Sequence, residues 1–195
     1  MKPEPSTERS IESAAAAAPH WTGAQVRAIL QEAGWLGEDS IASASPDSPQ
    51  MFLDNWLEEA AALLGPHAAD RAALTALLRM IFDYDPKAVL GDLENQSVLM
   101  RSGAREVIRE LANRVLAGSE IDSDQFKEIV EGIKAALPYR SRALFHPIRV
   151  ALAGHAGEGE LDRVILLLDS AAKLNFGAKV KGARQRMLEF CAALD

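Results

Sequence analysis

The amino-acid sequence predicts an all-α fold, and three observations support that prediction. Along most of the chain, apolar residues recur at intervals of three and four, the spacing of a helix with one buried face. The stretches begin at residues that cap helices well, such as Thr22 before the first and Asp85-Pro86 before the fourth. No stretch alternates between apolar and polar residues for long, so we expect no sheet.

The composition is that of a folded cytoplasmic protein. The chain has 195 residues, 48% of them hydrophobic and 25% charged, which is enough to bury a core. No apolar run approaches the length of a membrane span, and the acidic first residues do not form a secretory signal. The single cysteine, Cys191, cannot form an internal disulfide, which fits a reducing compartment.

The apolar pattern and its interruptions divide the chain into four parts. Residues 1–20 contain prolines, serines and an alanine run, and we expect a disordered tail. Residues 21–50 hold a short helix and a Ser/Pro-rich linker. Residues 51–138 form an acidic helical subdomain and residues 139–195 a second helical subdomain. We therefore expect two packed helical subdomains behind a mobile extension.

The helices can be placed in order from their stripes and stop signals. Asp122 with Gln125 is expected to form a capping box, and Gly118 and Gly154 are expected to end helices. We expect helices at about 22–33, 51–64, 69–82, 86–93, 102–117, 123–136, 144–154, 160–174 and 178–194.

No catalytic or metal site is evident. The histidines at 20, 67, 146 and 155 have no partners at metal-ligand spacing, so no metal and no cofactor are expected. The three tryptophans could stack on nucleic-acid bases. Trp56 lies on an apolar stripe, and Trp21 and Trp35 flank a short helix, so packing in the core is the expected role of all three.

Charge is unevenly distributed along the chain. The net charge of −7 argues against general nucleic-acid binding, because phosphate contacts require Lys and Arg. Residues 138–195 nevertheless hold nine Lys and Arg against six Asp and Glu. The sequence therefore predicts two different surfaces, an acidic one formed by the N-terminal part of the chain and a mildly basic one formed by residues 138–195.

The most informative segment is 141–154, Ser-Arg-Ala-Leu-Phe-His-Pro-Ile-Arg-Val-Ala-Leu-Ala-Gly. Pro147 is expected to begin a short helix that Gly154 closes, which puts Arg149 in the first helical turn. There the free N–H groups and the guanidinium would suit a phosphate or a base edge. The residues alone also allow Arg149 to pair with an acidic side chain or to lie along an apolar surface.

The run LFHPIRVALAG at 144–154 resembles the LxxPLRVALTG signature of bacterial glutamyl-tRNA synthetases. In that family the signature opens the last helical subdomain of the anticodon-binding region. Upstream, MIFDYDPKAVLGDL is similar to the aromatic-acidic stretch of the preceding subdomain. The resemblance covers about residues 51–195 and implies an all-α bundle like the synthetase anticodon-binding domain.

The resemblance also implies site residues. Arg149 matches the family arginine that reads an anticodon base, and Leu161 matches a leucine that packs near the anticodon. Glu158 stands where the family often has a threonine or serine. The Lys/Arg-rich run that precedes the final helix completes the expected RNA-binding surface with Lys179, Lys181, Arg184 and Arg186.

The HIGH-like and KMSKS-like signatures of the family's catalytic part are absent from this sequence. The resemblance thus implies a non-catalytic module that binds tRNA. The partners it implies are a glutamate-type tRNA and a separate catalytic protein. Two alternatives remain open. The chain is either a decayed synthetase paralogue that binds a protein partner, or the C-terminal portion of a longer synthetase.

Overall fold

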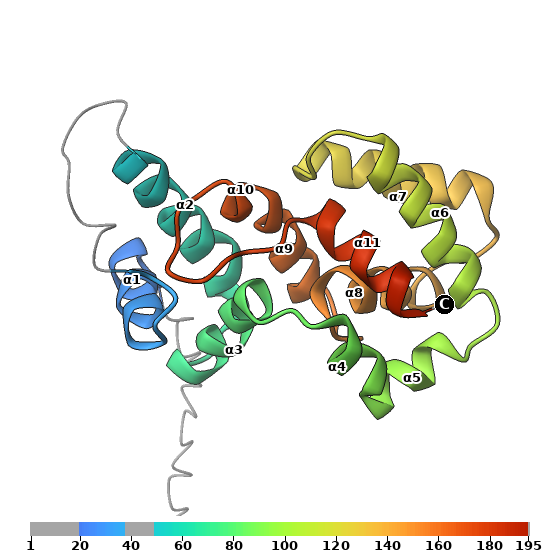
Figure 1. The fold of residues 1–195 in the computed structure, drawn as a ribbon, viewed down its shortest axis with the longest axis horizontal. Coiled ribbons are helices and arrows are strands. Elements are labelled where there is room, and N and C mark those ends of the chain that lie inside the picture. Colours follow the sequence, from blue (N-terminus) through green and yellow to red (C-terminus); the bar gives the residue numbers. More distant parts are fainter. Residues whose placement is uncertain (1–19, 38–48, 195) are drawn as a thin grey trace, which may run out of the picture.

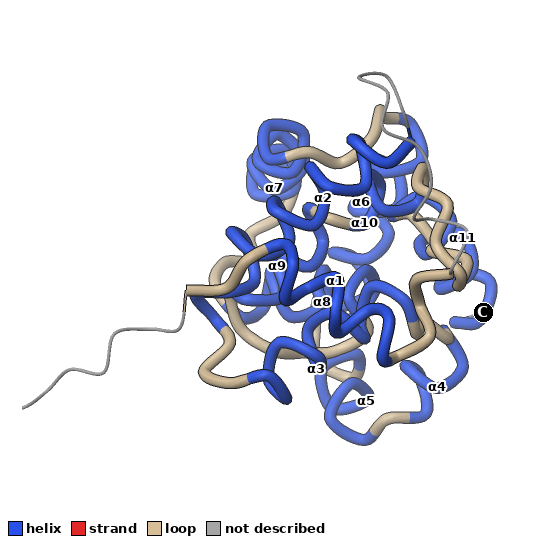
Figure 2. The backbone as a smooth tube through the Cα atoms, turned by 90° about the vertical axis from the view of Figure 1, so that its left-hand side faces the viewer, coloured by secondary structure: helices blue, strands red, loops and turns tan. Residues whose placement is uncertain are grey.

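The computed structural model describes residues 20–37 and 49–194, and helices make up its regular structure (Figure 1). Within this described part no residue is in a strand, and Figure 2 shows only helices joined by loops. The prediction of an all-α fold is confirmed. The expected tail, up to residue 19, and most of the expected Ser/Pro-rich linker lie outside the described residues.

The helices follow one another closely. In chain order they are α1 (Gly23–Glu32), α2 (Pro49–Leu64), the 3-10 turn η2 (Gly65–His67), α3 (Arg71–Phe82), α4 (Pro86–Gly91), α5 (Leu93–Leu99), α6 (Ala104–Ala117), α7 (Ser123–Ala136), α8 (Arg142–Ala153), α9 (Glu160–Leu166), α10 (Leu168–Ala172) and α11 (Ala183–Leu194).

The predicted helix starts are capped largely as expected. Thr22 accepts a hydrogen bond from the Gln25 main chain in a complete capping box, and Asp85 caps α4. Asp122 likewise accepts from the main-chain N–H groups that open α7. The second half of the box expected there is absent, because the Gln125 side chain instead accepts a hydrogen bond from Ser119 at 3.1 Å.

Outside α8, the helices differ from the prediction in three places. The helix α5 is not among those predicted, although Asp92 caps it through the Asn95 N–H group. The helix expected at 160–174 is interrupted at Leu167, which is fully buried, so that α9 and α10 are separate. The last helix begins at Ala183, five residues later than expected, because Asp169 of α10 accepts the Ala183 N–H at 2.7 Å and thus caps α11 from another helix.

The C-terminal helices lie between the two ends of the molecule. In Figure 1, α1 to α3 occupy one end and α4 to α7 the other, with α8, α9 and α11 between them. The helix α9 packs against α2 and α3, whereas α8 and α11 pack against α6. One cluster of buried apolar side chains extends from Val26 to Phe190 across residue 138, the expected subdomain boundary. The division into two packed subdomains at residue 138 therefore stays a prediction.

The tryptophans belong to this core. Trp35 stacks on Phe82 with ring centroids 4.9 Å apart, and Trp56 meets Phe176 edge-on at 5.1 Å. Trp21 is half-buried, and its indole N–H donates to the Ala68 carbonyl at 3.1 Å. These contacts join α1 to the rest of the molecule and leave Trp35 and Trp56 buried, away from any base that could stack on them.

Candidate nucleic-acid interface

The motif helix α8 begins earlier than the sequence suggested. It starts at Arg142, so Pro147 lies inside it and Arg149 is not in the first turn. The reason is the apolar stripe: Leu144 and Ile148 are fully buried, and burial of Leu144 draws the residues before Pro147 into the helix. Proline removes only the bond to the Ala143 carbonyl, and Ala143 is exposed to water. The expected anion-binding helix end beside Arg149 is therefore not formed.

Arg149 instead makes an internal ion pair. Its side chain is only 7% exposed, and its Nε and Nη2 atoms donate to the two carboxylate oxygens of Asp162 at 2.8 and 2.9 Å. Its Nη1 donates to the Gly157 carbonyl at 2.9 Å, and its guanidinium lies 5.2 Å from the centre of the Phe145 ring. Of the roles that the residues allow, this geometry is that of the paired arginine.

The pair closes the loop between α8 and α9. Gly154 ends α8 with a φ of +87°, and a Cβ added there would lie 3.2 Å from the Val89 side chain, so both backbone conformation and packing favour glycine. Leu161 is buried behind the loop. Glu158 is exposed at the tip, where Arg142 donates to it at 2.8 Å and Arg149 lies 3.9 Å away. A second arginine therefore compensates the carboxylate that departs from the family pattern.

The basic run before α11 does not form one exposed face. Arg186 is fully buried, and its guanidinium donates to the main-chain carbonyls of Lys181, Leu152 and Ile81 at 2.6 to 2.8 Å. Lys181 is partly buried and donates to Glu189 at 2.7 Å and to the Tyr84 carbonyl at 3.0 Å. These two cations hold loops together and are not free to meet an incoming phosphate.

Burial shifts the pKa values of Arg186 and of its neighbour Tyr84. It lowers the pKa of Arg186 to about 10, which leaves the guanidinium charged at neutral pH. Its charge lies 4.4 Å from the centre of the Tyr84 ring, and burial raises the pKa of Tyr84 well above its ordinary value. The neutral Tyr84 hydroxyl donates to the Ala151 carbonyl at 2.6 Å. The group thus ties α11 to α3, to the loop between α3 and α4, and to α8.

Two members of the run remain on the surface. Lys179 and Arg184 are exposed, and Arg184 donates to the Leu116 carbonyl at the end of α6. Within the described residues, no hydrogen bond or ion pair joins the Arg149 group to the Arg186 group. The structure therefore places the predicted residues in two clusters: Arg149, Glu158 and Leu161 in one, and Lys179, Lys181, Arg184 and Arg186, in α11 or just before it, in the other.

Sequence reasoning missed the residues that surround His146. Both ring nitrogens of His146 are buried without a hydrogen-bond partner, and burial lowers its pKa below the ordinary value. Glu158 opposes that shift, while Arg101, Arg149 and Arg142 add to it, so all four charges lie within electrostatic reach of the imidazole. Arg101 comes from the turn between α5 and α6, and nothing in the sequence pattern joins that turn to α8.

Two other classes of feature are absent from the described part of the chain. No group of three or more His, Cys, Asp or Glu side chains there is placed to hold a metal ion. None of its helices combines the length and apolar character needed to cross a membrane.

Comparison with known proteins identifies the family. The family model described as "Anticodon binding domain" matches residues 12–172. The chain is 29% identical over 131 residues to a "Glutamate--tRNA ligase" of Bacillus thuringiensis (strain Al Hakam), covering 65% of this chain and 26% of the relative.

Two further relatives carry similar descriptions. A "Glutamate--tRNA ligase 2" of Syntrophus aciditrophicus (strain SB) is 27% identical over 119 residues, covering 58% of this chain and 23% of the relative. A "Glutamate--tRNA ligase" of Sulfurihydrogenibium sp. (strain YO3AOP1) is 31% identical over 85 residues, covering 44% and 16%.

This chain therefore spans about a quarter of the length of the first of these relatives. No solved structure gives a significant match. The family model covers well over half of the chain, and the resemblance found in the motif at 144–154 is thereby confirmed. The chain belongs to the anticodon-binding domain family.

Proposed function

We propose that this chain is a non-catalytic module that binds tRNA at the anticodon arm. The observation that carries the proposal is the match of the anticodon-binding domain model to residues 12–172. The relatives are described as glutamate–tRNA ligases, so the proposed ligand is a glutamate-type tRNA. Ligation then requires a separate catalytic protein, and both partners meet in the cytoplasm.

The contact surface is proposed to consist of the exposed members of the two clusters. Lys179 and Arg184 supply exposed positive charge, and Glu158 lies at the tip of the α8–α9 loop. Its charge is offset by Arg142, which reduces its repulsion of phosphate. A carboxylate at this place can also accept a hydrogen bond from a cytosine amino group.

The buried members are proposed to shape this surface. Arg149 holds the loop through Asp162 and the Gly157 carbonyl, and Leu161 anchors the start of α9 in the core. Arg186 holds the segment that carries Lys179 and Lys181 against α8. A rigid loop costs less entropy to order on binding, so these residues support affinity without touching RNA.

Filter binding to total bacterial tRNA at about 50 and 200 mM salt tests the proposal. The parent protein is expected to retain tRNA at low salt and to lose affinity steeply at high salt, because each neutralised phosphate releases counterions. The double substitution Lys179→Ala and Arg184→Ala should weaken binding and reduce the salt slope by roughly one unit for each phosphate that is no longer neutralised. Arg71→Ala, an exposed cation at the far end on α3, is the matched control.

Retention of tRNA at neither salt concentration would refute the proposed function and would favour the protein-interaction module. If the parent binds but the double variant and the control bind equally well, the proposed surface is wrong. Glutamate-dependent pyrophosphate exchange by the purified chain would overturn its assignment as non-catalytic.

A further inference from the structure

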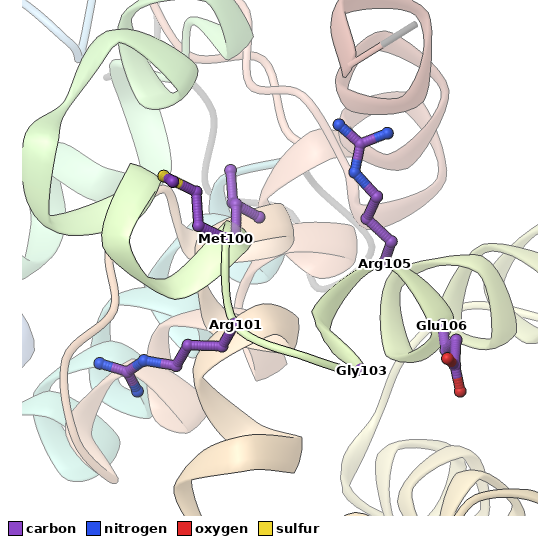
Figure 3. A pocket seen from close by; sticks show the side chains of 6 residues that line it. Met100, Arg101, Gly103, Arg105 and Glu106 are labelled. Carbon is purple, nitrogen blue, oxygen red and sulfur yellow. The ribbon is translucent and has the colours of Figure 1, made fainter.

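A pocket lies between the end of α5 and the start of α6, and none of its lining residues belongs to the two clusters described above. Its volume is ≈ 360 Å³, and we call it the α5–α6 pocket (Figure 3). This volume falls within the range of small-ligand sites. Its lining combines apolar and charged side chains: Leu99, Met100, Arg101, Gly103, Arg105 and Glu106.

The turn that forms the pocket is held in one shape. Gly103 has a φ of +86°, and the Tyr139 ring fills the space where a Cβ would stand, 2.1 Å from that position. The Ala104 N–H donates to the Arg101 carbonyl at 3.2 Å, and the Tyr139 hydroxyl donates to Glu106 at 3.2 Å. The backbone that carries the lining side chains is therefore already ordered and does not have to be ordered when a ligand binds.

The two cations of the pocket are unpaired within the described residues. Arg101 and Arg105 are both exposed, and neither guanidinium has a hydrogen bond or an ion pair within the part of the chain that the structure describes. By contrast, Arg114 on the same helix pairs with Glu110 at 2.7 Å. In Figure 3, Glu106 leaves the helix in a different direction from Arg105, and its carboxylate is engaged by Tyr139. The positive charge thus stays available to an anion.

The apolar wall of the pocket is equally exposed. Met100 is 86% exposed at the end of α5, and Leu99 behind it packs on the core. Its side chain therefore lies at the surface, accessible to a ligand in the pocket. The flexible, polarizable thioether of methionine packs favourably on the face of an aromatic ring. A nucleobase offers such a face, and the neighbouring arginines suit its phosphate.

The pocket lies beside the motif helix, because α5 and α6 both pack against α8. Arg101 acts electrostatically on His146, as do Arg142 and Glu158 of the α8–α9 region. A single strand of RNA that contacts the α8–α9 loop could therefore reach the α5–α6 pocket within a short length of backbone. Sequence-specific recognition of RNA generally uses unpaired, splayed-out bases of this kind.

We propose that the α5–α6 pocket binds one unpaired nucleotide of the RNA, with its base against Met100 and its phosphates beside Arg105 and Arg101. The inference rests on the proposed function and adds a site to it. Base stacking on an apolar side chain tolerates any base, whereas the arginines require a charged backbone. The site therefore contributes affinity for looped RNA over paired RNA.

The test compares two synthetic RNAs with the full chain. One is a 17-nucleotide hairpin with a seven-nucleotide loop, and the other is a blunt duplex of similar charge. Arg101→Gln with Arg105→Gln should weaken hairpin binding by at least about tenfold. Met100→Ser should weaken hairpin binding about three- to tenfold and leave duplex binding unchanged, since only an unpaired base can stack. Arg79→Gln, an exposed cation on α3, should change neither.

A direct readout accompanies the affinities. In NMR spectra of the protein with methyl-labelled methionine, five Met signals are expected. The signal that Met100→Leu removes belongs to Met100, and its chemical shift should change when the hairpin is added but not when the duplex is added. Failure of the parent to bind either RNA would overturn the proposed function and this site together. Tight hairpin binding by the parent with unchanged affinity in the pocket variants would overturn the site alone. So would equal losses for hairpin and duplex in Met100→Ser.

Discussion

The ion pair between Arg149 and Asp162 is the feature whose loss should change the protein most clearly. The Arg149 side chain is 7% exposed and that of Asp162 is 23% exposed, and the two meet through hydrogen bonds of 2.8 and 2.9 Å. Replacing Asp162 by leucine leaves a buried guanidinium with only the Gly157 carbonyl and a more distant Glu158. An orphaned buried charge costs roughly 3–5 kcal/mol of unfolding free energy.

Replacing the arginine of the pair should cost less unfolding free energy than replacing the aspartate. Arg149→Met keeps the aliphatic stem and leaves Asp162, which is nearly a quarter exposed and can regain water. We expect a loss of about 2–3 kcal/mol, the strength of hydrogen bonds to a charged group. The double variant Arg149→Met and Asp162→Leu should be more stable than Asp162→Leu alone, because neither charge is left without its partner.

Urea unfolding followed by circular dichroism measures these differences, and the four proteins form a double-mutant cycle. The expected coupling energy is about 2 kcal/mol or more, within the range found for residues that touch. A loss of stability below about 1 kcal/mol in both single variants, or costs that simply add, would contradict the buried pair.

The same proteins decide whether Arg149 also contacts RNA. If Arg149 acts only through the loop, tRNA binding should fall in both single variants, since either one frees the loop. If Arg149 instead reads a base, Arg149→Met should weaken binding by roughly 1–3 kcal/mol with little change in stability, while Asp162→Leu should bind at least as well as the parent. The second pattern would refute the positioning role.

Three further predictions concern other contacts. Gly154→Ala should cost about 1–2 kcal/mol, because a Cβ is strained at a φ of +87° and meets Val89 at 3.2 Å; an unchanged urea midpoint would contradict this. Arg186→Lys should lower stability by about 3 kcal/mol, since one ammonium cannot reach all three carbonyls, and a melting temperature within about 2 °C of the parent would count against it. The pKa of His146 is lowered in the folded state, so the stability it contributes should be present above about pH 6.5 and lost as the pH falls through the folded pKa. His146→Gln should therefore flatten the difference in unfolding free energy between about pH 7.5 and about pH 5.5, and an unchanged difference would refute the link.

Local signals in the sequence were sufficient for the helices. The stripe through Val26 and Ile29 and the cap at Thr22 act within one or two helical turns, where neighbouring residues alone decide the conformation. Errors occurred where a distant group intervened. Asp169 of α10 sets the start of α11, and Pro147 lies inside α8 because the core draws in the residues before it.

The motif likewise identified the family, because the order of residues at 144–154 is itself the signal. The same pattern draws attention to Arg149 but does not choose its partner, since Glu158, Glu160 and Asp162 all follow within a few positions of one another. Only the direction in which α9 leaves the loop puts the carboxylate of Asp162 against Arg149.

By itself, the sequence determined the helical fold, the family and the sign of charge along each segment, because all three depend only on residue types and on short spacings between them. The tertiary structure alone decided which charges reach solvent. Arg184 and Arg186 are two positions apart, about 200° around a helix, so one is exposed and the other lies fully buried among carbonyls. Exposure depends on what packs against each face, and in α11 that packing is supplied by α4, α6 and α8, while Arg186 also reaches the Ile81 carbonyl, 105 residues earlier in the chain.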